Sequence, residues 1–587
     1  MRKTIIALAV MSLAACATQP NNTSTVQTTN NNAVTASSQS EQFHQLADSI
    51  WETLSESDDT ALDDMSPEAL EQRYQRDSQW LEKLDAIAVE QLSKQDRINH
   101  AMIHYVVKNK VDNYRFKAHL MPLTAEGSFH SRLAFLPSYT RFAEKQDYLD
   151  YIAKLSTVNR YMKQQVNWLR EAIEQGYTQP QAAMAGFEES ILAYIVQDAE
   201  DSVFFDPFER QPKFVDDDNW QELKEQAKQI IDEQIMPAYD SYFSFMVGEY
   251  LPSSRETVGA SALPNGDAFY KNRIEHYTTT DLSASEIHQI GRQEVARIRA
   301  EMLEVIEESG FDGNFDEFVE FLRTDEQFYP ETAEELLKEA AYISKKMDGK
   351  LPGLFKTLPR KPYGVAPVPA EIAPKYTTGR YSGSNRDDRA GFYWVNTYAL
   401  DRRPLYQMEA LTLHEAVPGH HLQNALAGEM KDVPEYRQQT YISAFGEGWG
   451  LYSEYLGIEA GFYQDPYSDF GRLSYEMWRA ARLVVDTGMH AMGWSRQRAI
   501  DFMADNTALS LHNVTTEIDR YITWPGQALS YKLGELTIKR LRTNAEEQLG
   551  NDFDIREFHD AILENGSVPL DILEAHINDW IKQQKQQ

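Results

Sequence analysis

Apolar residues at helical spacing run through most of this 587-residue chain. In a helix, residues three and four positions apart share one face, so this spacing indicates helices that bury one face in a core. The stretches that show it contain few internal Gly or Pro residues. They lie at about 145–175, 179–199, 218–248, 283–309, 331–349, 404–429, 437–460, 467–493, 495–506 and 527–549. We therefore predict a large, mainly α fold.

One stretch, residues 351–400, breaks the helical pattern. Five prolines between Pro352 and Pro369 interrupt it, and Thr377–Ser384 then reads as a polar loop. The run Gly391–Thr397 (Gly-Phe-Tyr-Trp-Val-Asn-Thr) is typical of a short strand. We predict a small β region near 355–397. Two interpretations of its strand have equal weight: an ordinary structural strand, or an edge that pairs with an extended peptide.

The N-terminus has the pattern of a bacterial lipoprotein signal. Two basic residues precede the apolar stretch Thr4–Leu13, which leads into Ala14-Ala15-Cys16. A charged start, a short apolar segment and small residues before a cleavage site define a secretory signal, and its cysteine is a site for lipidation. We expect export across the inner membrane and a lipid anchor at Cys16. Ala17, rather than Asp, favours sorting to the outer membrane, facing the periplasm.

The rest of the chain divides by composition. The predicted signal covers residues 1–15, and residues 16–40 combine the lipidated cysteine with a flexible tether rich in Asn, Thr, Ser and Gln. Residues 41–587 form the predicted helical domain, with an N-terminal helical part at 41–350 and a catalytic part at 351–587. Cys16 is the only cysteine, so packing or a metal must supply the stability that disulfides give elsewhere.

The charge balance argues against two classes of partner. The formal net charge is −33, with 57 basic and 90 acidic residues. Nucleic acids and anionic membrane surfaces are themselves negative, so neither is expected to bind this surface. Membrane attachment is expected only through the lipid at Cys16.

The motif that carries most chemistry is His414-Glu415-Ala416-Val417-Pro418-Gly419-His420-His421. In zinc hydrolases, H-E-x-x-H places two imidazole ligands on one helical face with a glutamate as general base. Here the second histidine comes six or seven residues after the first. We predict Zn²⁺ as the cofactor, with His414 as first ligand and Glu415 as the base that takes a proton from the attacking water.

Two histidines compete for the second ligand position. On an unbroken helix His421 would return to the face of His414, but about 10.5 Å further along the axis. Pro418 removes a helical hydrogen bond, and Gly419 follows it, so a regular helix is not expected here. A bulge that holds the extra residues would bring His420 to His414. We favour His420 and keep His421 as the alternative.

A third ligand is expected downstream. Glu447 lies between two glycines, which permit close approach of another helix, and the 27 residues after His420 allow one helix to end and another to return. Glu454, two turns later, is the competitor. Most glutamates on helices simply face solvent, and this is the structural alternative for both.

With these residues in view, the chain resembles the family called domain of unknown function 885, whose hallmark is similar to His-Glu-Ala-x-Pro-Gly-His-His. Further blocks that resemble this family are Tyr277–Leu282, Glu294–Arg297, Asp486–His490 and Arg520–Tyr521 through Pro525–Ala528 with Tyr531. The family is thought to be related to helical zinc peptidases of the thimet oligopeptidase and thermostable carboxypeptidase kind. The resemblance implies a zinc-peptidase-like helical fold and, because the peptidase motif ends in Gly-His, supports His420. Two inserted residues separate this chain from the peptidase spacing.

Peptide hydrolysis also needs a donor for the developing oxyanion. We rank Tyr531 and His490 above Tyr521 for this role, and a packing histidine is an equal alternative for His490. Arg380, Arg386 and Arg389 could hold a substrate carboxylate, although solvated loop arginines are the commoner case.

We therefore predict a zinc metallopeptidase that hydrolyses peptides or oligopeptides in the cell envelope, with carboxypeptidase and endo-oligopeptidase polarity both open. One alternative is a zinc hydrolase of another amide or ester. The other is a non-catalytic envelope lipoprotein whose histidine cluster is structural.

Overall fold

The computed structural model describes residues 30–586 except 371, 385 and 387, so the predicted signal and Cys16 lie outside the described residues. Fourteen α-helices of the described residues precede the sheet along the chain. The first, α1 (Asn30–Ser55), begins inside the segment predicted as a tether. The following helices are α2 (Pro67–Asp85), α3 (Lys94–Arg115), α4 (Phe129–Leu133), α5 (Leu136–Tyr139), α6 (Lys145–Ser156), α7 (Val158–Gln175), α8 (Phe187–Leu192), α9 (Asp217–Ile230), α10 (Met236–Phe245), α11 (Gly266–Thr278), α12 (Ala284–Ser309), α13 (Phe315–Thr324) and α14 (Ala333–Asp348).

The second half of the described chain is also helical after a short sheet. Its helices are α15 (Met408–Glu415), α16 (His420–Gly428), α17 (Glu435–Gln439), α18 (Ser443–Ala460), α19 (Pro466–Ala491), α20 (Arg496–Ala504), α21 (Leu511–Thr523), α22 (Ser530–Leu549), α23 (Ile555–Leu563) and α24 (Leu570–Gln584). The prediction of a mainly α fold is confirmed. Within the described residues, no helix has both the length and the apolar character that a membrane span requires.

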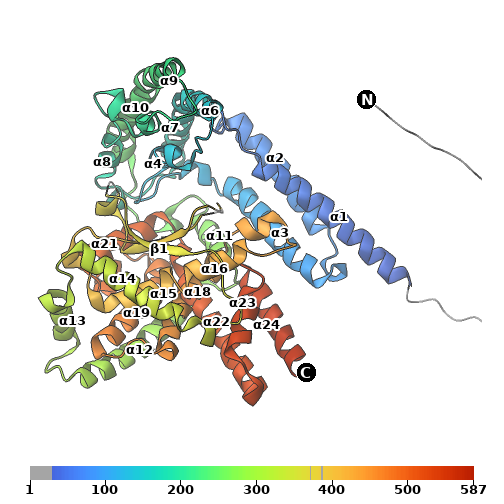
Figure 1. The fold of residues 1–587 in the computed structure, drawn as a ribbon, viewed down its shortest axis with the longest axis vertical. Helices are drawn as coiled ribbons and strands as arrows, with labels where there is room; N and C mark the ends of the chain where they lie inside the picture. Colours follow the sequence, from blue (N-terminus) through green and yellow to red (C-terminus); the bar gives the residue numbers. More distant parts are fainter. Residues whose placement is uncertain (1–29, 371, 385, 387, 587) are drawn as a thin grey trace, which may run out of the picture.

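Four hydrophobic clusters of described residues organise the helices, and two of them are much larger than the others. The larger core takes residues from α1 to α24, including Phe43, Trp449 and Ile581. A separate core is built from residues between Leu123 and Tyr250, and Figure 1 shows α6 to α10 gathered at one end of the molecule. Helices from both predicted parts of the domain, 41–350 and 351–587, therefore share the larger core.

The predicted β region is a three-stranded sheet. Central strand β3 (Gly391–Val395) pairs in parallel with β1 (Tyr363–Pro367) and antiparallel with β2 (Gly379–Ser382). The strand prediction at 391–397 is confirmed. Its interpretation as an edge that pairs with a peptide is wrong, because β3 has a paired strand on both sides. The polar loop predicted at 377–384 is also wrong because it contains β2. Polar side chains do not prevent its backbone from pairing with β3. The order β1-β3-β2 leaves β2 as an edge strand, and it contacts α15.

One helical prediction is also wrong. The stretch 179–199 holds only α8 and short 3₁₀ turns. Pro180 precedes the first turn, and Gly186 adopts a left-handed conformation (φ +74°) immediately before α8. A continuous helix cannot pass through a left-handed residue, so the segment folds as separate short turns.

Helix α18 packs very closely against α22. A Cβ atom added to Gly448 would lie 2.5 Å from the Cα of Gly534, so the two backbones meet at a pair of glycines. Only residues without a side chain permit this separation. The contact fixes the position of α18, which carries the predicted third ligand.

Candidate metal centre

The helix of the histidine motif is broken as its proline and glycine predict. Helix α15 ends at Glu415 and α16 begins at His420. The intervening loop is held at both ends: the Gly419 N–H donates to the Leu413 carbonyl (3.0 Å), and the Trp449 indole donates to the Pro418 carbonyl (2.8 Å). A Cβ atom at Gly419 would collide with the His414 carbonyl oxygen. The compact loop therefore requires glycine, and it lets the side chains of two residues six positions apart come close together.

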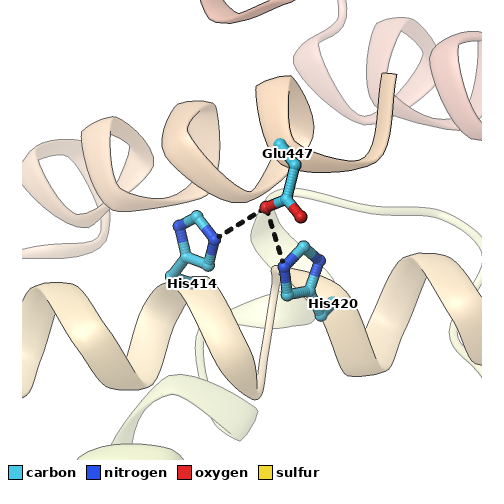
Figure 2. Close-up of side chains that lie close together, drawn as sticks. All are labelled: His414, His420 and Glu447. Carbon is cyan, nitrogen blue, oxygen red and sulfur yellow. Dashed lines mark ion pairs between the residues drawn. The ribbon is translucent and has the colours of Figure 1, made fainter. Parts of the chain in front are cut away.

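Three predicted ligands meet across this break. His414, His420 and Glu447 each offer a ligand atom, and these atoms lie within 4.8 Å of one another. The Glu447 Oε2 atom is 3.5 Å from His414 Nε2 and 3.3 Å from His420 Nε2 (Figure 2). The two histidines come from α15 and α16, and Glu447 reaches them from α18, which runs alongside both (Figure 2).

These separations fit a shared zinc ion. Ligand atoms about 2.05 Å from a tetrahedral zinc lie about 3.3 Å from one another. Direct charge-assisted hydrogen bonds are shorter, about 2.7–2.9 Å. The measured 3.3 and 3.5 Å match the first geometry, and two imidazoles with one carboxylate are a donor set that zinc uses in hydrolytic sites.

One face of α18 shapes the surroundings of His414. Glu447, Gly450 and Glu454 follow at helical spacing, so they lie on one side of the helix. Glu454 Oε1 is 2.7 Å from His414 Nδ1, while Glu447 faces Nε2, so the imidazole stands between two carboxylates. Gly450 makes room for it, because a Cβ there would lie 2.7 Å from the ring. Glu454, the competitor for third ligand, thus orients the histidine instead.

The carboxylates around His414 determine which charge is favourable at this position. Glu454 is also 3.0 Å from the Arg479 guanidinium. Burial by itself lowers the pKa of His414, but its hydrogen bonds to Glu447 and Glu454 outweigh burial and raise that pKa to about 10. Two carboxylates therefore favour a positive charge at this position, whether from a proton or from a metal ion.

The other two members of the cluster, His420 and Glu447, are also held by their neighbours. The Gln423 amide nitrogen lies 2.7 Å from His420 Nδ1 and donates to the Gly446 carbonyl at 3.0 Å, which ties the second histidine to α18. Burial alone would raise the pKa of Glu447. The charge of His420, together with the hydrogen bonds to His414 and His420, outweighs burial and holds that pKa well below the ordinary value. Glu447 is therefore a carboxylate, the form that binds metal.

Glu415 and Tyr531 approach the same place from different elements. The Glu415 carboxylate accepts a hydrogen bond from the Tyr381 backbone N–H of β2 (2.7 Å), and the residue is 9% exposed. The ring of Tyr531, on α22, lies 6.4 Å from the ring of His414, centroid to centroid. The Arg482 guanidinium covers Tyr531 at 4.2 Å. The predicted base and one predicted oxyanion donor thus border the cluster.

The other predicted residues lie apart from the cluster. His421 has its ring nitrogens 3.1 Å from the Tyr381 hydroxyl and 3.1 Å from the Lys361 carbonyl, and burial lowers its pKa to about 4. His490 is fully buried, accepts from the Ala260 N–H and lies 3.0 Å from the Tyr521 carbonyl. Both imidazoles are committed to protein groups, which leaves no nitrogen for a metal or a substrate. The Tyr521 hydroxyl donates to Glu517 inside the core.

Sequence reasoning missed Tyr441. Its ring packs against Gly446, where a Cβ would overlap the phenol. Loss of water around the phenol is the main cause that raises the pKa of Tyr441, and the charge of the Glu447 carboxylate is the next. The residue is 42% exposed overall, and its hydroxyl lies close enough to Glu447 to feel its charge. Tyr441 lies just before α18, and no motif surrounds it. The only feature of the sequence that points to it is its position six residues before Glu447.

Comparison with known proteins gives a family and a fold. A family profile described as "Bacterial protein of unknown function (DUF885)" matches residues 50–577. A crystal structure of a candidate lipoprotein from Colwellia psychrerythraea is 28% identical, with a TM-score of 0.83, over 93% of this chain and 99% of that one. A candidate lipoprotein of unknown function from Shewanella oneidensis has 15% identity and a TM-score of 0.63, with the same coverage, and therefore shows a shared fold.

A third structure is much more distant. The M32 carboxypeptidase from Deinococcus radiodurans R1 aligns at 10% identity with a TM-score of 0.29, over 89% of this chain and 99% of that one. A score this low does not establish a common fold. No curated protein matches the sequence. The family match spans most of the chain, and the protein accordingly belongs to the DUF885 family of bacterial proteins of unknown function.

Proposed function

We propose that this protein is a zinc-dependent peptidase of the bacterial cell envelope. The observation that carries the proposal is the cluster of His414, His420 and Glu447, whose 3.3 and 3.5 Å separations suit a tetrahedral zinc ion. When bound there, zinc would lower the pKa of water toward neutrality and polarise a substrate carbonyl. The envelope location is supported by the signal pattern ending at Cys16 and by two similar proteins described as candidate lipoproteins.

Glu415 is proposed as the general base. It directly follows the ligand His414, and the Tyr381 N–H binds its Oε2 atom, which orients the carboxylate. The carboxylate takes a proton from the attacking water and then delivers it to the leaving amine, so one group serves both halves of the reaction. Tyr531 and Tyr441 are proposed as hydroxyl donors to the oxygen that becomes negative.

The edge strand suits a peptide substrate. The Tyr381 N–H points away from β3 toward Glu415, so the outer edge of β2 faces the proposed base. An extended peptide that pairs with such an edge presents its backbone carbonyls in a regular row. A peptide is therefore the proposed substrate, and it would lie along β2 beside the Tyr381 N–H that is already bonded to Glu415.

The test separates metal binding from hydrolysis. Glu415→Gln should retain zinc, measured by metal analysis, and lose hydrolysis of a peptide library by about 10²- to 10⁴-fold. Glu447→Ala should lose zinc. The matched control is Glu459→Gln, on the same helix α18, where the carboxylate pairs with Arg542 away from the cluster. Unchanged hydrolysis by Glu415→Gln, or stoichiometric zinc in Glu447→Ala, would contradict the proposal.

A further inference from the structure

Arg380 is a cation beside the proposed site, and the proposed reaction gives it no part. It lies on edge strand β2, one residue before Tyr381, whose N–H holds Glu415. Its side chain is exposed and rests 5.5 Å from the centre of the Tyr376 ring. Within the described part of the chain, no carboxylate oxygen lies within 4 Å of its guanidinium. Burial works against the charge of Arg380, but the nearby groups Tyr376, Glu126, Glu415 and Tyr531 outweigh burial and raise the pKa of Arg380.

The other arginines near the cluster are already engaged. Arg479 pairs with Glu454 at 3.0 Å, and Arg482 pairs with Glu517 at 3.0 Å. Both are buried, and both hold residues of the protein itself. Arg380 differs because the residue is exposed and, among the described residues, its guanidinium pairs with no carboxylate of the centre. It is therefore the arginine that an incoming ligand can reach.

A protein carboxylate already approaches this region. Glu126 follows the turn that starts at Thr124, and its Oε1 atom is 3.5 Å from the Arg520 Nε atom. Its charge also acts on Arg380. The Glu126 side chain is 44% exposed, so it can move aside without disturbing the core. An acidic ligand at Arg380 would therefore meet the Glu126 charge as a competitor.

We infer that Arg380 binds a carboxylate of the peptide substrate, either the C-terminal carboxylate or an acidic side chain. The inference deepens the proposed function and rests on it. A guanidinium binds a carboxylate through two parallel N–H···O hydrogen bonds, which fix the orientation as well as the position of the bound group. A peptide held in this way by its C-terminus would present a bond near that end to Glu415, so Arg380 would set the cleavage polarity.

Binding is measured in the Glu415→Gln protein loaded with zinc, so that probes are not consumed. Three N-acetylated alanine pentapeptides serve as probes: one with a free C-terminus, one with a C-terminal amide, and one amide with glutamate as its last residue. Arg380→Met removes the charge and keeps the length of the side chain. The control is Arg386→Met, because Arg386 is exposed and pairs locally with Asp388.

Arg380→Met should weaken binding of the carboxylate probe by about 10- to 100-fold, as expected for the loss of a charged hydrogen-bond partner. The plain amide should change by less than about 2-fold, and Arg386→Met should leave all three affinities unchanged. Glu126→Gln should strengthen carboxylate binding by up to about 5-fold, because it removes a competing charge.

The three probes identify the source of the carboxylate. A loss confined to the free-acid peptide assigns Arg380 to the C-terminus, and a loss confined to the glutamate peptide assigns it to an acidic side chain. Equal weakening of all three probes, or no preference for a carboxylate with Arg380 intact, would overturn the inference. Hydrolysis by the protein with Glu415 intact is judged separately. A carboxylate preference without hydrolysis would therefore contradict the proposed function and leave Arg380 as a carboxylate site.

Discussion

Adding one methyl group at Gly450 should disable the metal centre. A Cβ atom there would lie 2.7 Å from the Cε1 and Nε2 atoms of His414, whereas ordinary contact begins near 3.4 Å. The imidazole must retreat by about 0.7 Å, and a metal site tolerates only about 0.2 Å in its ligand distances. We expect Gly450→Ala to weaken zinc binding by at least the 10- to 100-fold that follows from a misplaced ligand.

The assay is a competition titration with a zinc-binding dye, combined with thermal unfolding with and without zinc. The fold should survive, because overpacking costs about 1–3 kcal/mol and the better helix propensity of alanine returns about 0.5–1 kcal/mol. Gly428→Ala is the matched control: Gly428 ends α16, and nothing lies within 4 Å of its Cβ position. Wild-type zinc affinity in Gly450→Ala would refute the assignment of His414 as a ligand.

Three further predictions concern single side chains. Glu454→Gln should lower zinc affinity by about 10- to 100-fold in the same titration, since the amide holds the metal-facing imidazole less firmly. His420→Ala should abolish stoichiometric zinc in metal analysis, whereas His421→Ala should keep the zinc and lower only the unfolding temperature. Burial raises the pKa of Asp486 from 3.8 to about 7, so the folded state holds a proton that the unfolded state releases between these values. Stability should therefore fall by up to about 4 kcal/mol as pH rises from about 4 to about 7, and denaturant titrations of Asp486→Asn should not show this fall. A constant free energy of unfolding in the wild type across that range would contradict the expectation.

Local sequence indicates which three residues come together, because their meeting depends largely on local geometry. Pro418 and Gly419 indicate a broken helix, and the structure forms the break between Glu415 and His420. Glycines around Glu447 indicate a close helix contact, and α18 meets α22 at Gly448. The spacing of the long helices followed from their apolar periodicity in the same way.

The residues that orient the proposed ligands cannot be predicted from local sequence, because tertiary packing brings them to the site. From sequence, Glu454 is a competing candidate for third ligand. Its actual place beside His414 Nδ1 depends on which face of α18 turns toward α15. Arg479, which pairs with Glu454, comes from α19 and carries no motif. His490 stood out as a lone histidine in a family block, but only the structure shows that its ring binds the backbone. Strand β2 was missed because backbone pairing with β3, not side-chain type, decides it.

The crossing of α18 and α22 has a consequence for the order in which the protein matures. All three proposed ligands are synthesised by residue 447, but the helix that fixes α18 ends about 100 residues later, at Leu549. Arg479, which steadies the carboxylate on His414, also emerges after the ligands. A nascent chain that stops before α19 would carry every ligand and still lack the frame that spaces them. Metal capture is therefore expected to be a late event, after the C-terminal helices have docked.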